Sequence, residues 1–451
     1  MFSARNVTER GIDRTQGFRL ISNLDFLTEH KRTNVAPGDV LLTIVGTIGR
    51  THVVRAGDVP LVLQRSVAVL RPKNDLNCDY LKYWLDGPIA QHFFQVNARG
   101  TAQKGVYLST LREVPTRLPS LNQQRRIVAA IETHFSRLDA AVASLTRAKA
   151  NVKRARASVL KAAVEGRLVP TEAALARAEG RDYEPASTLL ARILVERKAA
   201  WSASGARGKY KEPVAPEVEN GAALPDGWCW CSIEQVTIDG FANGLYMPKS
   251  AYGAGMPILR IEDFQDDSSR DAADFRKVNI DAPTANRYAL DVGQLVINRV
   301  NAMTHLGKCL AIEARHAPAV FESNMMRATM HPNCIVRFVT AWLRSKPGRT
   351  LLVRHAKWAV NQASINQGDV EQTAVPLPPL AEQHRIVAEV DRRLSVLDAI
   401  GAALDVNLAR CARLRQAVLK RAFEGRLVPA EISPAGAEAG AAGGDDTRAA
   451  S

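Results

Sequence analysis

The stretch "LPSLNQQRRIVAAIETHFSRLDAAVASL" (118–145) decides the fold, because a second version of it stands later in the chain. "LPPLAEQHRIVAEVDRRLSVLDAIGAAL" (377–404) aligns with it without a gap. The match continues in "RARASVLKAAVEGRLVP" (154–170) and "RLRQAVLKRAFEGRLVP" (413–429), at the constant offset of 259 residues that separates position 166 from position 425. A repeat at a fixed offset indicates one structural unit that is used twice.

Apolar residues recur in each copy at steps of seven, with a second row three or four positions along, which is the a/d pattern of a coiled coil. The ends carry helix signals. Ser120 and Gln123 fit a capping box, and Gly166 and Gly425 suit the left-handed position after a helix. We therefore predict two helices of roughly 60–65 Å each. The predicted seam residues are Ile131, Phe135, Leu138, Val142, Leu145, Val152 and Val159, with Val390, Leu394, Leu397, Leu404, Leu408, Cys411 and Val418.

Each predicted helix has a single apolar stripe and needs a partner to cover it. The two copies are the obvious partners for each other, because their stripes match row for row. The alternatives are that each helix packs elsewhere, or that the repeat mediates self-association.

The segment before each helix is expected to be globular, with short β-branched runs between turns. The two segments resemble each other weakly. "APGDVLLTIVGTIGRTHVV" (36–54) resembles "DVGQLVINRVNAMTHLGKCLAI" (291–312), and "DYLKYWL" (79–85) resembles "RFVTAWL" (337–343). We predict an α+β fold class: two globular mixed α/β domains of one fold and two long helices that form a coiled coil, in a pseudo-two-fold internal repeat.

The domain order is therefore domain, helix, domain, helix. The first domain is expected to lack its N-terminal part, because 224–258 has no counterpart ahead of Arg5. A low-complexity tail is expected to be disordered. The predicted boundaries are 1–117 for the first domain, 118–168 for the first helical region, 169–222 for a linker with an amphipathic helix, 223–376 for the second domain, 377–428 for the second helical region and 429–451 for the tail.

Charge and composition narrow the class of protein. Lys and Arg number 60 against 46 Asp and Glu, a net charge of +14 that suggests a polyanionic partner, nucleic acid before membrane. No apolar run approaches the roughly 20 residues that cross a bilayer, and the first residues have no apolar signal region. The six cysteines form no CxxC pair, so we expect reduced, mostly buried thiols, a cytoplasmic location and no zinc site.

The stretch "PLPPLAEQHRIVAEVDRRLSVLD" (376–398) closely resembles the conserved helical region of the DNA specificity subunits of type I restriction–modification systems. "YKEP" (210–213) and "LPDGWCW" (224–230) look like this family too. The order of the domains also matches, so the resemblance covers nearly the whole chain.

The resemblance implies a subunit without catalysis of its own. Two target-recognition domains would read the two halves of a split double-stranded DNA site, and antiparallel helices would hold them a fixed distance apart. The helical regions would dock two modification subunits, which bind S-adenosylmethionine and methylate adenine N6. Restriction subunits, with ATP and magnesium, would then translocate and cleave DNA. No cofactor and no membrane partner is expected for this chain.

Two motifs that would indicate catalysis are absent from the sequence. The chain has no GxxxxGK[ST] loop and no Asn/Asp-Pro-Pro-aromatic motif, and "PLPPL" has neither the polar residue nor the aromatic one. Asp182, Glu196 and Lys198 imitate a nuclease spacing, but the last two fall on the predicted linker helix. The alternative function is a non-enzymatic coiled-coil adaptor that binds protein. A standalone nuclease or methyltransferase is a third and weaker hypothesis.

Candidate base-reading residues are those able to pair with base edges from loops that enter the major groove: Arg and Lys with guanine, Asn and Gln with adenine. Each of them is individually an ordinary solvated loop residue, and the set as a whole is the prediction. The candidates are Thr47, Arg50, Gln64, Arg65, Ser66, Gln103 and Lys104 in the first domain, and Asn298, Arg299, Asn301, His305, Lys308, Ser323, Asn324, Arg327, Asn361, Gln362, Ser364 and Asn366 in the second.

Overall fold

The computed structural model describes residues 1–8, 11–15, 17–100, 104–205, 208–218, 223–265, 268–359 and 362–429. The chain divides into two compact units. Unit 1 is Met1–Lys149 together with the chain from Ala402 onward, and unit 2 is Ala150–Gly401. Apart from Pro429, the predicted tail lies outside the described residues. Each unit therefore contains one globular segment, the start of one long helix and the end of the other.

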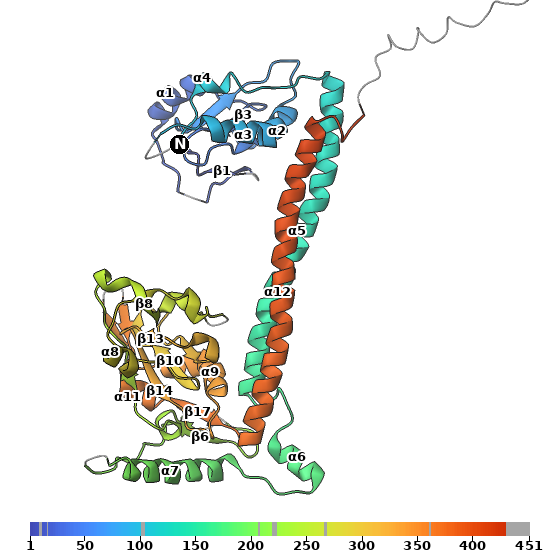
Figure 1. Cartoon of the computed structure of the whole chain (residues 1–451). Helices are drawn as coiled ribbons and strands as arrows, with labels where there is room; N and C mark the ends of the chain where they lie inside the picture. The colour runs from blue at the N-terminus through green and yellow to red at the C-terminus, as the bar shows by residue number, and fades with distance from the viewer. Residues whose placement is uncertain are drawn as a thin grey trace, which may run out of the picture. The chain divides into compact units, whose positions relative to one another are not determined.

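The two long helices are α5 (Leu121–Val164) and α12 (Leu380–Phe423), with 44 residues each. Their ion pairs define the direction: as the position on α5 rises from 139 to 156, the partner on α12 falls from 415 to 398, one for one. The prediction that the two copies pair with each other, as antiparallel helices, is confirmed within each unit (Figure 1). The pairs are Asp139 with Arg415, Lys149 with Asp405, and Arg156 with Asp398.

The apolar seam is most deeply buried where each helix pair meets a globular segment. In unit 1, Ile131 and Phe135 belong to one core with Leu419. In unit 2, Val159 belongs to one core with Val390. Between these ends the seam is half-buried, as expected where only two helices cover each other, and all of the predicted seam residues are buried or half-buried.

Both copies of GRLVP end a helix in the same way. Gly166 and Gly425 have φ values of 66° and 77°, and the next residue donates its N–H to a carbonyl five positions back, at 2.8 Å in each copy. This is the Schellman stop. The segment also meets the start of the other long helix, because Gln123 Nε2 donates to the Pro429 carbonyl at 3.1 Å and Arg385 to the Pro170 carbonyl at 3.5 Å. The repeated motif thus ends one helix and attaches it to the other.

The globular part of unit 1 is a three-stranded antiparallel sheet in the order β4-β3-β5, with helices packed on it. The core contains Trp84, which lies on α2, and Phe423, the last residue of α12. The elements are β1 (Val7–Thr8), β2 (Gly11–Ile12), α1 (Asn23–Thr33), β3 (Val40–Thr43), β4 (Thr51–Val53), β5 (Val67–Leu70), α2 (Cys78–Asp86), α3 (Pro88–Asn97) and α4 (Leu108–Leu111).

Unit 2 repeats this arrangement as β12-β10-β14, followed by two short helices and then α12. A second group of strands extends the sheet region, and the parallel pairing of Leu259 with Phe321 within it has a short counterpart in unit 1, the parallel bridge of Phe2 with Leu63. The repeated elements are β10 (Gln294–Asn298), β12 (Cys309–Ala311), β14 (Met325–Thr329), α9 (Val336–Arg344), α10 (Lys346–Leu352) and α11 (Gln367–Glu371). The others are β6 (Cys229–Ser232), β7 (Ala242–Asn243), β8 (Tyr252–Leu259), β9 (Lys277–Val278), α8 (Ala282–Arg287), β11 (Val300–Asn301), β13 (Val320–Phe321), β15 (Lys357–Ala359), β16 (Gln362–Ser364) and β17 (Ala374–Leu377).

The predicted linker is part of unit 2. It contains α6 (Glu172–Glu179) and α7 (Ala186–Ala203), and α7 places Leu189 and Ile193 in the main core of the unit. At the start of α6, the buried Glu172 pairs with Arg385 at 2.6 Å. The neighbouring Glu382 accepts hydrogen bonds from Trp228 Nε1 and the Glu172 N–H, and its burial raises the pKa of its carboxyl.

Matching hydrogen bonds show that the two units are copies. Trp84 Nε1 donates to the Pro115 carbonyl at 3.1 Å, and Trp342 Nε1 donates to the Ala374 carbonyl at 2.8 Å. Gln124 and Gln383, fully buried at the start of each long helix, each accept the N–H that precedes α2 or α9, at 2.8 Å. The predicted fold class is confirmed, including its internal repeat.

We expect Gln383→Leu to destabilise unit 2 by about 2–4 kcal/mol, since it leaves the half-buried Ile335 N–H and the buried Pro378 carbonyl without their side-chain partner. Hydrogen exchange of the α9 amides measures the loss. Gln416→Leu, on the exposed face of α12, is the matched control and should change little. Equal exchange rates in the two variants would show that Gln383 does not hold α9 to the helix.

Candidate nucleic-acid interface

In unit 1, three predicted residues meet in one cavity. Thr47 follows β3, while Gln64 and Ser66 precede β5, and all three line a cavity of about 590 Å³. The first residues of the chain form the opposite wall: the Gln64 N–H donates to the Phe2 carbonyl at 2.7 Å, and Ser66 Oγ accepts from the Ala4 N–H at 3.1 Å. These bonds bring loops that are far apart in sequence to one place.

The cavity is basic. Arg5 and Arg19, which the sequence analysis did not select, line it with exposed side chains. Lys104 lies beside the cavity, because its carbonyl accepts the N–H of the lining residue Gly46 at 3.3 Å. Its side chain is exposed. Arg50 and Arg65 are exposed on the flanking turns, whereas Gln103 lies outside the described residues.

In unit 2, six predicted residues lie around the small sheet β11-β16-β15. Asn301 pairs with Ala363 in this sheet, so it lies next to Gln362 and Ser364. The Arg299 N–H donates to the Asn324 carbonyl at 2.7 Å, and its guanidinium reaches the Ser323 carbonyl at 3.4 Å. The six are Arg299, Asn301, Ser323, Asn324, Gln362 and Ser364, all of them half-buried or exposed.

Four other candidates hold the loops in place. Asn298 is fully buried and donates to the His305 carbonyl at 2.9 Å, and Lys308 is buried with its ammonium on Gln265 Oε1. Arg327 lies over the Phe321 ring and donates to the Arg287 carbonyl at 3.1 Å. Asn366 caps α11 through Asp369. Asn361 lies outside the described residues.

Several buried polar atoms at this place have no hydrogen-bond partner within the described part of the chain. They are Asn298 Oδ1, Arg299 Nε, His305 Nδ1 and Arg327 Nη1. Buried polar groups are nearly always paired, so these atoms are places where an ordered water molecule or a polar ligand would complete the hydrogen bonding. All four belong to residues that the sequence analysis selected.

Exposed aromatic residues lie beside these candidates and were missed. Trp358, on β15, is 72% exposed and pairs with Ala363 in the sheet that carries Asn301. Tyr246 is 78% exposed and follows Leu245, whose carbonyl accepts the Ser323 N–H at 2.9 Å. Large apolar side chains of this kind can contact the methyl group of thymine or stack on an unpaired base. The sequence carried only a weak signal, a tryptophan that directly follows Lys357.

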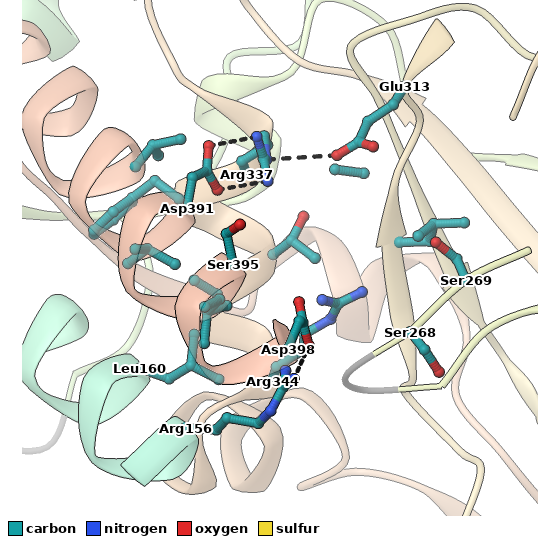
Figure 2. A pocket seen from close by; sticks show the side chains of 18 of the residues that line it. Arg156, Leu160, Ser268, Ser269, Glu313, Arg337, Arg344, Asp391, Ser395 and Asp398 are labelled. Carbon is teal, nitrogen blue, oxygen red and sulfur yellow. Dashed lines mark hydrogen bonds and ion pairs between the residues drawn. The ribbon is translucent and has the colours of Figure 1, made fainter. Parts of the chain in front are cut away.

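Unit 2 also contains a cavity, of about 500 Å³, which lies between its globular part and the long helices (Figure 2). Arg337 of α9 crosses it to Asp391 of α12 at 2.6 Å and also faces Glu313 at 3.6 Å. Arg156 of α5 pairs with Asp398 at its floor. The arginines that line this cavity are paired with acidic side chains or carbonyls. Their ion pairs connect the globular part to the helices, and the cavity is not part of the candidate nucleic-acid interface.

The nuclease-like spacing does not converge. Glu196 pairs with Arg192 and His331, and Lys198 pairs with Glu212 at 2.9 Å. The described residues contain no group of three His, Cys, Asp or Glu side chains arranged to hold a metal ion, and none of their helices is long and apolar enough to cross a membrane. None of the six cysteines, all of which lie in the described ranges, forms a disulfide bond, and burial raises the pKa of the Cys334 thiol to about 12.

Comparisons with known proteins agree with the geometry. Residues 5–146 match the family model of the type I restriction modification DNA specificity domain. The chain is 29% identical over 203 residues to the type I restriction enzyme StySPI specificity subunit of Salmonella potsdam, covering 45% of this chain and 43% of that one. It is 28% identical to the EcoKI specificity subunit of Escherichia coli K12, covering 41% and 40%. The alignments thus span less than half the length of these relatives.

The fold has a solved counterpart. A chain from a structure of a type I R-M system, solved for its complex assembly and conformational transition, superposes with a TM-score of 0.57 at 20% identity, over 87% of this chain and 83% of that one. The family model, the relatives and the doubled unit point the same way: residues 5–146 match the type I specificity domain, and the chain is similar to specificity subunits of type I restriction enzymes.

Proposed function

We propose that the chain is the DNA-reading subunit of a type I restriction–modification complex, with one recognition surface in each unit. The observation that carries this proposal is one structural unit that occurs twice with different loops. The hydrogen bonds of Gln124 and Trp84 in unit 1 match those of Gln383 and Trp342 in unit 2. A repeated scaffold with divergent loops suits a site with two unlike halves. The net charge of +14 favours a polyanionic ligand.

In this proposal, residues 1–117 and 223–376 are the recognition domains, and 118–168 and 377–428 are the helical regions that set their spacing. Direct base contacts come from the exposed candidates, such as Gln64 and Gln362, whereas Asn298 and Lys308 shape the loops from within. The chain itself carries no catalysis, and binds double-stranded DNA. Two modification subunits supply the S-adenosylmethionine chemistry, and restriction subunits supply the ATP- and magnesium-dependent steps.

The test is an exchange of residues 224–376 for the same segment of a relative. Sequencing of methylated sites in a host that carries the chimera and its modification subunits should show one half of the recognised sequence changed and the other half unchanged. The reciprocal exchange of 1–117 is the matched control and should change the opposite half. A chimera that changes both halves, or neither, would contradict the modular proposal.

The protein-binding adaptor hypothesis gives a different result in the same experiment. An adaptor has no sequence-dependent effect on methylation, so neither exchange would move the methylated sites.

A further inference from the structure

Trp358 is a large apolar side chain that contributes little to the core of unit 2. It lies on β15, at the edge of the sheet β11-β16-β15, and is 72% exposed, whereas Trp228 and Trp342 are buried in cores of the same unit. Single exposed apolar residues are common on proteins, so exposure alone assigns no role to Trp358. Its surroundings do.

One row of the sheet joins Trp358 to a predicted base-reading residue. Trp358 pairs with Ala363 on β16, and Ala363 pairs with Asn301 on β11. Residues directly opposite each other project from the same face of a sheet, so Asn301 and Trp358 share one face, about 10 Å apart across two strand spacings. Ala363 between them is buried in the main core, which fixes the row. The two outer side chains are therefore held on one surface and can contact the same half-site.

The chain around Trp358 carries positive charge only. Residues 323–368 contain seven Lys and Arg and no Asp or Glu. Lys357, directly before Trp358, has an exposed side chain. Arg299 is attached to the end of β16, because its carbonyl accepts the Ile365 N–H at 2.9 Å. A surface of this charge suits a phosphate backbone, so DNA is favoured over a protein as the ligand that covers Trp358.

Methylation of adenine creates a need for an aromatic side chain at such a surface. The N6 atom cannot be reached inside a duplex, so an enzyme that modifies it rotates the base out of the stack and leaves the opposite base unpaired. An aromatic ring can stack on an unpaired base. The neighbouring Asn301 and Gln362 can pair with base edges but cannot replace a lost stacking partner.

We propose that Trp358 stacks on the base that is left unpaired when the target adenine of the half-site read by unit 2 is rotated out. The recognition surface of unit 2 then has two tasks: its polar side chains select the sequence, and Trp358 stabilises the opened duplex while the modification subunit acts. The inference rests on the proposed function, because it requires both DNA reading and adenine methylation.

The test compares the two half-sites of one recognised sequence. Two duplexes each have one half-site already methylated, so that only the other can react, and the domain exchange described above assigns each half to its unit. In complexes of the full chain with its modification subunits, we expect Trp358→Ala to slow methylation of the half-site read by unit 2 by roughly tenfold or more, the loss of one aromatic–base stack. The half-site read by unit 1 should react at the parent rate, and Trp358→Phe should retain most of the rate at both.

A mismatch opposite the target adenine separates stacking from a structural role. A mismatched base leaves the stack at lower cost, so the rate of Trp358→Ala on mismatched DNA should return to within about threefold of the parent on the same DNA. Val292→Ala, on an exposed position before the other end of β10, is the matched control and should methylate both half-sites like the parent.

Equal slowing at both half-sites, a parent rate for Trp358→Ala, or a defect that the mismatch leaves unchanged would each overturn the proposal. Failure of Trp358→Ala to assemble with the modification subunits would identify a protein contact instead and would overturn it too. A parent complex that methylates neither half-site would refute the proposed function itself, and this inference with it. A parent that methylates both, with Trp358→Ala equal to it, would refute the inference alone.

Discussion

Phe423→Ala is expected to unfold the first globular segment, although the substitution lies near the far end of the sequence. Phe423 is buried in the core of unit 1, where its ring packs edge-on against Trp84 at 4.9 Å and against Tyr80 at 5.5 Å between centroids. Removing a buried phenylalanine costs about 3–5 kcal/mol, a large fraction of a domain's stability. Hydrogen exchange of α2 and α3 measures this loss.

The repeat supplies the control for this experiment. Val164, the last residue of α5, is the counterpart of Phe423 and lies in the core of unit 2. Val164→Ala should loosen α9 and α10 and leave α2 and α3 unaffected, whereas Phe423→Ala should do the reverse. Leu414→Ala, on a largely exposed position of α12, should alter neither. Loss of protection in both units after Phe423→Ala would show that the units do not unfold separately.

This dependence explains why the sequence predicted the helices better than their surroundings. Val159 and Val390 recur in a period that is visible along a single chain, so their pairing could be predicted. The contact of Phe423 with Trp84 joins residues at opposite ends of the chain, and no local pattern encodes it. Helix α7 was predicted as amphipathic, but its apolar face alone could not predict that it packs in the main core of unit 2.

The candidate interface shows the same limit. Arg299 and Asn301 were found because Arg and Asn in a turn after a buried strand are typical base-reading residues. Lys308 fits that description equally well, yet its side chain is buried with the ammonium on Gln265. Trp358 was missed because its exposure follows from the position of β15 at the edge of a three-stranded sheet, which emerges only in three dimensions.

A paired insertion in the two long helices is expected to change the distance between the recognised half-sites. Lys149 pairs with Asp405, so seven residues inserted after Ala148 and seven after Asp405 face each other and preserve the heptad seam. Each helix lengthens by about 10.5 Å, which corresponds to roughly three base pairs at about 3.4 Å each. Methylated sites mapped by sequencing should keep both half-sequences and gain about three base pairs between them.

The mismatched control is four residues inserted after Ala148 alone. Four residues do not complete a heptad, so the apolar positions of α5 beyond the insertion move about 6 Å along α12 and rotate by about 40°, which takes them out of register with their partners. Methylation should fall sharply, since the helix pair no longer joins the ends that Gln123 and Arg385 attach. If the paired insertion left the gap between half-sites unchanged, the helices would serve only to dock other subunits, and spacing would have to be set elsewhere in the complex.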